Sequence, residues 1–517
     1  MKKFTIQHTM KKYFKEKASL TVFCAILSAF TLIAYNIPAF RFAANDLNGG
    51  FEAVVIISSL VVIMLALNYF VYYLILWLGR TVGKCIVALS FIFNSIALYF
   101  INTFDVSIDD SMMGNVFNTQ WSEASGFFSL GWVMYVLLLG ILPSIYVIAR
   151  KVNYGSVKRM GANIGGTLAL TLAVIAANIP NWTFINRNQG PLGSLVLPWS
   201  YTVNSFRYHS AVRRMNQPEI LLPDAVFTTG SKDVCILVIG ESARRDHFSL
   251  YGYGRETNPL LKQDNVTTLA ATSAGTYTIL GVKAILSHTP TDDPMEILPN
   301  YLYRSGAEVI WRTSNWGEPP VNIDKYLKVN DLKQRYPEAD ERYDGILHEG
   351  LAEEIKASDK QKILVVLHTS TSHGPVYDNL YPEEFRRFTP VCTTAELSKA
   401  DLGELVNAYD NTILYTDFLL HSVIGELQSL PEDWRRCMIY VSDHGESLGE
   451  NGIYMHGVSM SMAPKEQYEI PFIVWMSEGA ARVKEIKEAG QFNVFHSVMD
   501  FLGARSDIYD ENMNIFE

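Results

Sequence analysis

The sequence predicts an N-terminal five-helix transmembrane domain followed by a C-terminal α/β domain with a mostly parallel central sheet. Long uncharged stretches in the first 186 residues and short apolar strands alternating with helical segments after residue 233 carry this prediction. The composition agrees, because 49% of the 517 residues are hydrophobic and only 19% are charged. That charged share is below the ~25% usual for soluble proteins.

The formal net charge of −10 describes neither half of the chain. Residues 1–180 carry 13 Lys and Arg against 7 Asp and Glu, whereas residues 181–517 carry 30 against 46. Two physically different domains are therefore joined in one chain. The acidic second half argues against nucleic acid as a partner, because nucleic-acid binding needs a basic face.

Five uncharged stretches are each long enough for the ~20 residues that a helix needs to cross a bilayer. They are residues 18–40, 53–79, 85–104, 124–149 and 160–186. Buried helices in a large soluble core are the alternative, which five such runs in succession disfavour. The first run is read as an uncleaved span, because it is long for the apolar region of a signal peptide.

Basic residues in the loops predict the orientation of these spans. The segments before span one, between spans two and three, and between spans four and five hold 12 basic residues and one acid. The opposite loops, 41–52 and 105–123, hold one basic residue and six acids. We therefore expect a cytoplasmic N-terminus, and an odd number of spans places the chain after about residue 187 outside the cytoplasm.

The stretch between the two halves mixes Trp, Tyr and Phe with Pro, Gly and polar residues. Trp and Tyr favour the membrane–water interface, so an interfacial linker is expected, with a simple extended linker as the alternative. The predicted domains are a transmembrane domain (1–180), the interfacial linker (181–232) and an exported domain (233–517).

Short apolar runs in the exported domain read as buried strands, and longer amphipathic runs between them read as helices. The predicted strands are Val234–Ile239, Glu308–Trp311, Ile363–Leu367, Met438–Val441 and Phe472–Trp475. The predicted helices are Asp293–Tyr303, Ile346–Ala357 and Leu402–Leu430. This alternation predicts a mostly parallel sheet, in which ligands bind beyond the carboxyl ends of the strands.

Polar residues stand in the loops that follow three of these strands. Glu241 comes after the first strand, His373 after the third, and Asp443 and His444 after the fourth. Carboxylate oxygens and imidazole nitrogens gathered at one sheet edge suit Zn²⁺. The alternative for any single histidine is an ordinary hydrogen-bonded residue, but Asp443-His444 together with Glu241 favours a metal site.

A hydroxyl-rich turn, residues 271–280, leads into an apolar helical segment. Hydroxyls at a helix start face unsatisfied N–H groups that favour a phosphate. A Thr hydroxyl is a weak nucleophile until a metal lowers its pKa. The pattern alone leaves two readings open, a nucleophile and an ordinary helix cap.

At these residues the sequence resembles a known family. The series VIGESARRDHFSLYGYGRETNPL, SAGTYT, SHGP, NAYDNTILYTD and SDHGESLGENGIYMHG, following the spans, is similar to the lipid A phosphoethanolamine transferases. These enzymes include the mobile colistin-resistance enzymes and belong to the alkaline phosphatase/sulfatase superfamily. The resemblance covers nearly the whole chain.

The resemblance implies roles for individual residues. It makes Glu241, Asp443 and His444 zinc ligands, and it makes Thr278 the nucleophile and a further metal ligand, with Thr276 as the weaker candidate. It also implies that His373 and His456 contact the phosphoryl group or a second zinc, and that Asn315 contacts the substrate.

The resemblance further implies that Asn115, Thr119 and Glu123 help to bind the phosphoethanolamine head group. Their i, i+4, i+8 spacing puts them on one helical face. Without the resemblance, a solvated helix face would be the preferred reading of these three residues.

The chain departs from the family pattern at several positions. Ala274 stands where a Cys is common, Lys283-Ala284 replaces a Pro-Cys pair, and Cys392 lacks its usual partner. The five cysteines, an odd number without close pairs, argue against a disulfide framework. Pro319 occupies the place of a Lys, and Val458-Ser459-Met460 replaces a motif that often reads x-Pro-Tyr. These changes bear most on acceptor specificity.

The function that the resemblance implies is zinc-dependent transfer of phosphoethanolamine from phosphatidylethanolamine to lipid A or another surface glycan. The enzyme is expected to be a monomer in the inner membrane of a Gram-negative bacterium, with its catalytic domain in the periplasm. Its product would be less attractive to cationic peptides. The alternatives are a membrane-anchored phosphatase or sulfatase, a glycerol-phosphate transferase, and a sensor or scaffold on an inactive fold.

Overall fold

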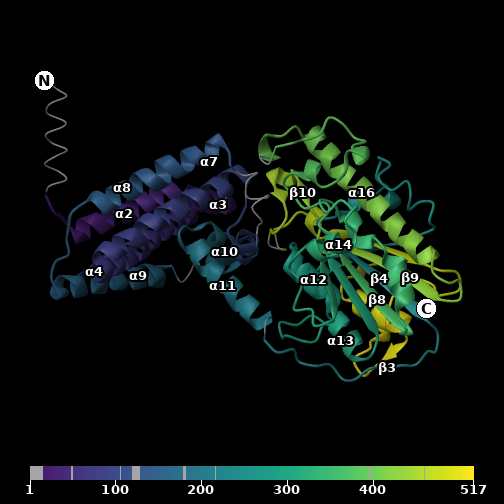
Figure 1. Ribbon diagram of the computed structural model, residues 1–517. Helices are drawn as coiled ribbons and strands as arrows, with labels where there is room; N and C mark the ends of the chain where they lie inside the picture. The colour runs from purple at the N-terminus through teal and green to yellow at the C-terminus, as the bar shows by residue number, and fades with distance from the viewer. Residues whose placement is uncertain are drawn as a thin grey trace. The chain divides into compact units, whose positions relative to one another are not determined.

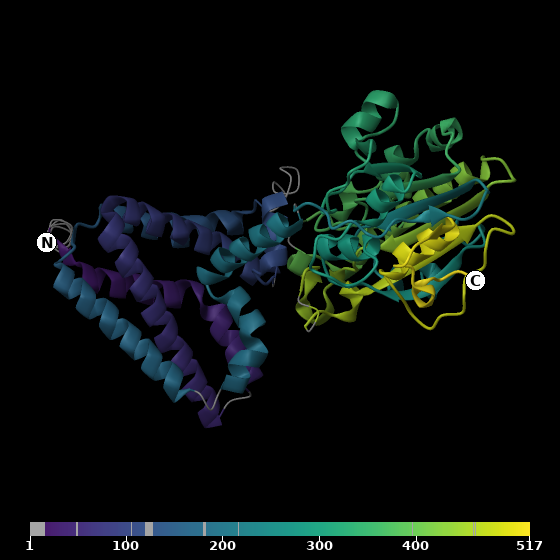
Figure 2. The same cartoon turned by 90° about the horizontal axis from the view of Figure 1, so that it is seen from below.

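The computed structural model describes residues 16–47, 50–104, 106–118, 128–178, 182–215, 217–394, 397–458, 460 and 462–517. The chain divides into two compact units, Met1–His209 and Ser210–Glu517, and each can be followed in Figures 1 and 2. The division falls inside helix α11 (Trp199–Met215), within the stretch that the sequence predicts as a linker.

The first unit is built from helices. They are α2 (Leu20–Tyr35), α3 (Ile37–Asp46), α4 (Gly50–Phe104), α5 (Asp110–Asn118), α7 (Leu130–Tyr135), η1 (Val136–Ile141), α8 (Leu142–Ala149), α9 (Val157–Ala177), α10 (Trp182–Leu195) and α11. The segment predicted as an interfacial linker thus contains two helices. The predicted fifth span, 160–186, is shorter in the structure, because α9 ends at Ala177 and Asn178 bonds back to the carbonyl of Val174.

Three helical stretches of the described residues are long and apolar enough to cross a membrane: Ala53–Phe104, Leu130–Ala149 and Val157–Ala177. The pair α2 and α3, bent by 58°, makes a fourth if it is counted as one span. This is a coarser result than the five spans predicted from the sequence.

Helix α4 is not one straight rod. Its backbone leaves the helical region at Arg80, where φ is 42° and ψ is −104°. The ring centroids of Tyr72 and Phe91 lie 6.3 Å apart across this break. A continuous helix would separate these two residues by roughly 28 Å along its axis. The chain therefore folds back at Arg80 into two packed helical arms.

The second unit has an eight-stranded central sheet in the order β13-β5-β12-β9-β4-β8-β6-β7. The strands are β13 (Ala489–Gly490), β5 (Thr267–Thr272), β12 (Glu469–Met476), β9 (Arg435–Ser442), β4 (Asp233–Gly240), β8 (Lys362–His368), β6 (Glu308–Thr313) and β7 (Lys325–Lys328). All five predicted strands are present, and the sheet is mostly parallel. The exception is β12, which runs antiparallel to both β9 and β5.

Helices cover both faces of the sheet because alternate residues of each buried strand point to opposite sides. On β4, Cys235, Leu237 and Ile239 belong to one core, and Val234, Ile236 and Val238 belong to the other. The first core includes residues of α12 (Thr278–Leu286), α13 (Leu298–Arg304) and α17 (Asn493–Phe501), and the second includes residues of α15 (Leu351–Ala357) and α16 (Leu402–Gln428). Figure 1 shows α12 and α16 on opposite sides of the strands.

Two of the predicted helices are shorter than expected. The predicted helix 293–303 begins only at Leu298, and the predicted helix 346–357 splits into a 3-10 turn (Asp344–His348) and α15. Gly350, with φ of 61°, separates the turn from α15. The predicted helix 402–430 is α16, which ends at Gln428.

The register of β4 and β9 sets up the site. These parallel strands are hydrogen-bonded neighbours, and Gly240 pairs with Ser442 at their carboxyl ends. The next residues, Glu241 and Asp443, are therefore brought side by side. The same register pairs Cys235 with Cys437, a proximity that their spacing in the sequence does not reveal; all five cysteines are free thiols.

Candidate active site

The loops after β4 and β9 place two carboxylates in the interior. Glu241 and Asp443 are both completely buried, and so is His444. Ser242 adopts a positive φ of 52°, and its backbone N–H donates to Oδ1 of Asp443 at 3.0 Å. Oδ1 also accepts from the N–H of His444 at 2.7 Å, so one oxygen of Asp443 is fixed by two backbone donors.

Thr278 is the first residue of α12, and its hydroxyl points toward Glu241 and His444. Its Oγ1 lies 3.2 Å from Oε2 of Glu241 and 3.4 Å from Nε2 of His444. The cap position of α12 belongs to Tyr277, so Thr278 is not the helix cap that the sequence left open. A Cβ at Gly281 would come within 2.1 Å of the carbonyl oxygen of Asp443, so glycine permits this close approach of α12.

Three histidines present the same ring nitrogen to the site. Nδ1 of His444 bonds the carbonyl of Gly445 at 2.8 Å, and Nδ1 of His373 bonds the carbonyl of Gly374 at 2.9 Å. Nδ1 of His456 lies 3.3 Å from the carboxylate of Glu446. A proton on each Nδ1 leaves the lone pair of Nε2 for a metal, whereas a phosphoryl oxygen would need the doubly protonated imidazolium as its donor.

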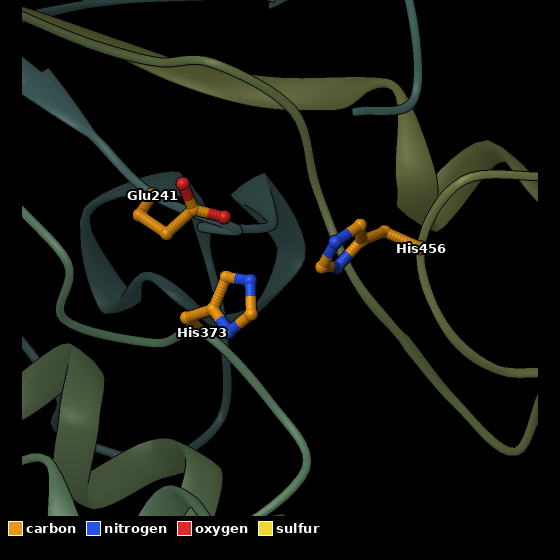
Figure 3. A group of neighbouring side chains, drawn as sticks. All are labelled: Glu241, His373 and His456. Carbon is orange, nitrogen blue, oxygen red and sulfur yellow. The ribbon is translucent and has the colours of Figure 1, made fainter. Parts of the chain in front are cut away.

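The structure brings these residues together as two groups that share Glu241. Ligand atoms of Glu241, Asp443 and His444 lie within 4.8 Å of one another, and so do those of Glu241, His373 and His456. Figure 3 shows the second group, whose three side chains converge from separate segments of the chain.

The surroundings of Oδ2 of Asp443 indicate whether a cation fits this site. Among the described residues, Oδ2 of Asp443 is buried without a hydrogen-bond partner. It lies 3.3 Å from Nε2 of His444, and that nitrogen is 3.3 Å from Oε1 of Glu241. A buried unpaired carboxylate oxygen is costly, and two carboxylates with an imidazole form a donor set that suits Zn²⁺.

The charges of the two buried carboxylates, Glu241 and Asp443, also favour a cation at this site. Burial opposes ionisation of Glu241, but the hydrogen bond and charge of His444 hold the pKa of Glu241 well below its usual range. Burial and the neighbouring Glu241 raise the pKa of Asp443 well above its usual range. Burial opposes a proton on His444, yet the two carboxylates raise its pKa to about 10. A divalent cation would neutralise this buried pair more completely than one proton on His444.

Asn315, which follows β6, touches the site directly. Its Nδ2 donates to Oε2 of Glu241 at 2.8 Å and to the carbonyl of Thr369 at 2.7 Å. Thr276 is oriented differently, because its hydroxyl donates to the carbonyl of Val458 at 2.6 Å. That contact turns the Thr276 hydroxyl away from Glu241.

The predicted head-group residues cannot be placed here. Thr119 and Glu123 lie outside the described residues, and of Asn115 only the backbone in α5 is described. Sequence reasoning also missed Glu446 and Tyr409, although both lie inside the motifs quoted above. The sequence shows only that each is a polar residue within one of these motifs; it does not show that Glu446 contacts His456 or that Tyr409 bonds the backbone of Ser242.

Comparisons with known proteins cover both units. Residues 233–504 match the sulfatase family, and residues 63–212 match the family described as phosphoethanolamine transferase EptA/EptB. The chain is 36% identical to phosphoethanolamine transferase EptA of Helicobacter pylori over 90% of both chains. It is 32% identical to phosphatidylethanolamine transferase Mcr-1 of Escherichia coli, covering 91% of this chain and 92% of that one.

A solved structure is similar over the whole length. The integral membrane protein lipooligosaccharide phosphoethanolamine transferase A (EptA) from Neisseria meningitidis superposes with a TM-score of 0.85 at 27% identity. The match covers 97% of this chain and 99% of that one, so both units take part in it.

Proposed function

This chain belongs to the phosphoethanolamine transferase family, and on that premise we propose that it moves phosphoethanolamine from phosphatidylethanolamine to lipid A through a covalent intermediate on Thr278. The observation that carries the proposal is the Thr278 hydroxyl, 3.2 Å from Glu241 and directed at the Glu241–Asp443–His444 group. The name of the Mcr-1 relative supports the donor, and the name of the Neisseria structure supports an acceptor in the lipooligosaccharide.

The reaction has two displacements at phosphorus. The Thr278 Oγ1 attacks, the bond from phosphorus to the diacylglycerol oxygen breaks, and diacylglycerol leaves with a proton. An oxygen of the acceptor then attacks the same phosphorus and Thr278 leaves, which restores the hydroxyl. Two half-reactions on one nucleophile imply ping-pong kinetics.

The residues of the site divide the work. Glu241, Asp443 and His444 would hold a zinc ion, whose charge would lower the pKa of the Thr278 hydroxyl and offset charge on the phosphoryl oxygens. The hydroxyl donates to Glu241, which orients Oγ1 toward phosphorus. His373 and His456 direct Nε2 into the same space, where the doubly protonated imidazolium of either would donate to the leaving oxygen or to a phosphoryl oxygen.

The second group, Glu241 with His373 and His456, supports a further zinc of lower affinity. Its two imidazoles are neutral ligands, and it shares its only carboxylate with the first group. The first group has a second carboxylate, Asp443, which it does not share. We therefore propose one firmly bound zinc and a weaker second one.

The first unit is proposed to cross the inner membrane five times. The fold-back at Arg80 divides α4 into two arms of sufficient length, which supports one more span than a count of α4 as a single helix. With α2–α3, α7–α8 and α9 this makes five. The N-terminus is then cytoplasmic, the catalytic unit is periplasmic, and the enzyme works as a monomer beside both lipid substrates.

We propose that the segment 181–232, which contains α10 and α11 and connects the domains 1–180 and 233–517 in the sequence, lies at the periplasmic surface of the inner membrane. Exposed Phe206 and the basic end of α11 at Arg213 and Arg214 support contact with lipid head groups there. Asn115, Thr119 and Glu123 remain the proposed ethanolamine-binding residues.

Mass spectrometry of lipid A tests the proposed function. A Gram-negative host that makes unmodified lipid A should gain species heavier by one phosphoethanolamine when it expresses the wild-type chain, and none when it expresses Thr278→Ala at equal abundance. Susceptibility to cationic peptides should fall only with the wild type, because the added amine offsets an anionic phosphate. Unchanged lipid A in the presence of folded wild-type enzyme would reject lipid A as the acceptor.

A further inference from the structure

A cleft with a volume of about 490 Å³ opens along one side of α12. It begins at Ala274, in the turn that leads to Thr278, and it continues along the helix to the loop 287–292. A volume of this size is typical of small-molecule sites. Nothing in the proposed chemistry at Thr278 uses this cleft.

Helix α12 presents two faces with different tasks. Thr278 and Gly281 face the proposed zinc ligands: the Thr278 hydroxyl lies next to Glu241, and Gly281 approaches Asp443 closely. Leu280, Lys283 and Ala284 line the cleft, at the i, i+3, i+4 spacing of one helical face. Lys283 follows Thr278 by five residues, an axial distance of only ~7.5 Å. A ligand in the cleft therefore lies within one or two helical turns of the nucleophile.

The hydrogen bonds of Gln491 connect the cleft with the site. The backbone N–H of Ala274 donates to Oε1 of Gln491 at 2.8 Å. Nε2 of the same glutamine donates to the carbonyls of Asp443 at 2.6 Å and Ser442 at 3.0 Å. Phe492, the next residue, lines the cleft. Gln491 thus fixes the position of the cleft relative to the loop that carries Asp443.

The lining combines one cation with several hydroxyls and an aromatic ring. Lys283 donates to the carbonyl of Thr291 at 2.7 Å, which uses one of the three N–H groups of its ammonium. Thr289, Thr291, Asp292 and Phe492 also line the cleft. Hydroxyls and a carboxylate pair with sugar hydroxyls, an ammonium pairs with a phosphate, and an aromatic ring packs on the apolar face of a sugar ring.

We propose that this cleft binds a phosphorylated saccharide, namely the sugar–phosphate part of the acceptor glycolipid that lies beyond the reacting group, with Lys283 on its phosphate. The proposal rests on the proposed function and names the acceptor subsite of the same enzyme. An acyl chain is a poorer occupant, because it would place apolar carbon against the ammonium of Lys283 and the carboxylate of Asp292. The donor head group carries no sugar, so the cleft acts only in the second half-reaction.

The test separates the two half-reactions of the full-length enzyme in detergent. Without acceptor, intact-protein mass spectrometry follows formation of the phosphoethanolamine adduct on Thr278 from phosphatidylethanolamine. With diphosphoryl or monophosphoryl lipid A as acceptor, loss of the adduct and gain of product are followed as acceptor concentration varies. The variants are Lys283→Gln, Lys283→Arg and Thr289→Trp, which puts bulk into the cleft from an exposed position. Lys262→Gln, at an exposed lysine that is not part of the cleft lining, is the matched control.

Lys283→Gln should leave adduct formation unchanged and raise the acceptor KM by about 10-fold, the ratio expected for loss of one charge-assisted hydrogen bond. Lys283→Arg should recover most of this loss, Thr289→Trp should also raise the acceptor KM, and Lys262→Gln should behave as the wild type. The Lys283→Gln effect should be larger with the diphosphoryl than with the monophosphoryl acceptor.

Unchanged acceptor KM in both Lys283→Gln and Thr289→Trp would overturn the proposal. An equal loss of rate in both half-reactions would also overturn it. The substitutions would then act by displacing the turn that carries Thr278, and not by weakening acceptor binding. Absence of any adduct in the wild type is a different result, which rejects the proposed function itself.

Discussion

The side-chain amide of Asn315 lies 2.8 Å from Oε2 of Glu241, the same carboxylate oxygen that accepts from the Thr278 hydroxyl. The amide also holds the carbonyl of Thr369, so the loops after β6 and β8 are both tied to Glu241. A residue that orients a proposed metal ligand in this way is expected to contribute to metal affinity and activity without binding the metal.

Asn315→Ala should lower the zinc affinity or the transfer rate by about 10- to 100-fold, because Glu241 loses the donor that sets its orientation. Zinc competition with a chelator and the rate of adduct formation measure the two effects. Asn322→Ala is the control, since the Asn322 amide bonds Glu219 on an exposed part of the same connection. Wild-type zinc affinity together with a wild-type rate in Asn315→Ala would show that Glu241 keeps its orientation unaided.

The two threonines of the nucleophile turn should behave differently. Thr278→Ala removes the hydroxyl that faces Glu241, so the covalent adduct and all transfer should be lost. Thr276→Ala removes only a hydrogen bond to the carbonyl of Val458, so adduct formation should continue at a reduced rate. Peptide mapping of the trapped intermediate identifies the modified residue. An adduct on Thr276 would contradict the assignment of Thr278.

The sequence predicts the residues of this site better than it predicts their contacts. Strand ends identify Glu241, Asp443 and His444, because apolar runs locate β4 and β9 and parallel strands share one edge. The pairing of Cys235 with Cys437 and the donation from Asn315 to Glu241 depend on strand order and register, which periodicity does not encode. For the same reason the antiparallel course of β12 was not predicted.

The helical unit illustrates the same limit. Hydropathy locates the apolar segments on either side of Arg80 but carries no information about the bend between them. The strands β5, β7 and β13 also escaped prediction, because they are not apolar runs: β5 has Leu269 as its only large apolar residue, β7 begins and ends with Lys, and β13 has only two residues.

Tyr409 is expected to matter through the loop that carries Glu241. Its hydroxyl donates to the carbonyl of Ser242 at 2.7 Å and accepts from the N–H of Arg244 at 2.9 Å. Tyr409→Phe leaves both buried backbone groups unpaired, which should cost about 1–3 kcal/mol of unfolding free energy. Because these groups flank the strained Ser242, zinc affinity should fall as well.

Tyr301→Phe separates this effect from simple destabilisation. Tyr301 is also fully buried, and its hydroxyl donates to the carbonyl of Pro223 at 2.8 Å, in a connection that carries none of the proposed zinc ligands. Thermal unfolding should register both substitutions, whereas zinc affinity should fall only in Tyr409→Phe. Equal zinc affinity in the two variants would leave Tyr409 a purely structural role.

The two ligand groups should differ in zinc affinity. Asp443→Asn removes a charged ligand from the first group and should abolish binding of the tightly bound zinc ion. His373→Ala should abolish binding of only the weaker, second zinc ion. Zinc titration of the metal-free protein with elemental analysis measures both. A single equivalent in the wild type that persists in His373→Ala would limit the enzyme to one ion.

The fold-back at Arg80 predicts where Cys85 can be labelled. If each arm of α4 is a span, the turn that contains Arg80 and Lys84 faces the cytoplasm, because basic loops are retained there. Cys85 is the exposed member of the five cysteines, and the other four are buried. A membrane-impermeant maleimide should therefore leave the wild type unlabelled in intact spheroplasts and label it after permeabilisation. Ser107→Cys in a Cys85→Ser background, on the opposite side of the second arm, should be labelled in intact spheroplasts; the reverse pattern would require α4 to cross the membrane differently.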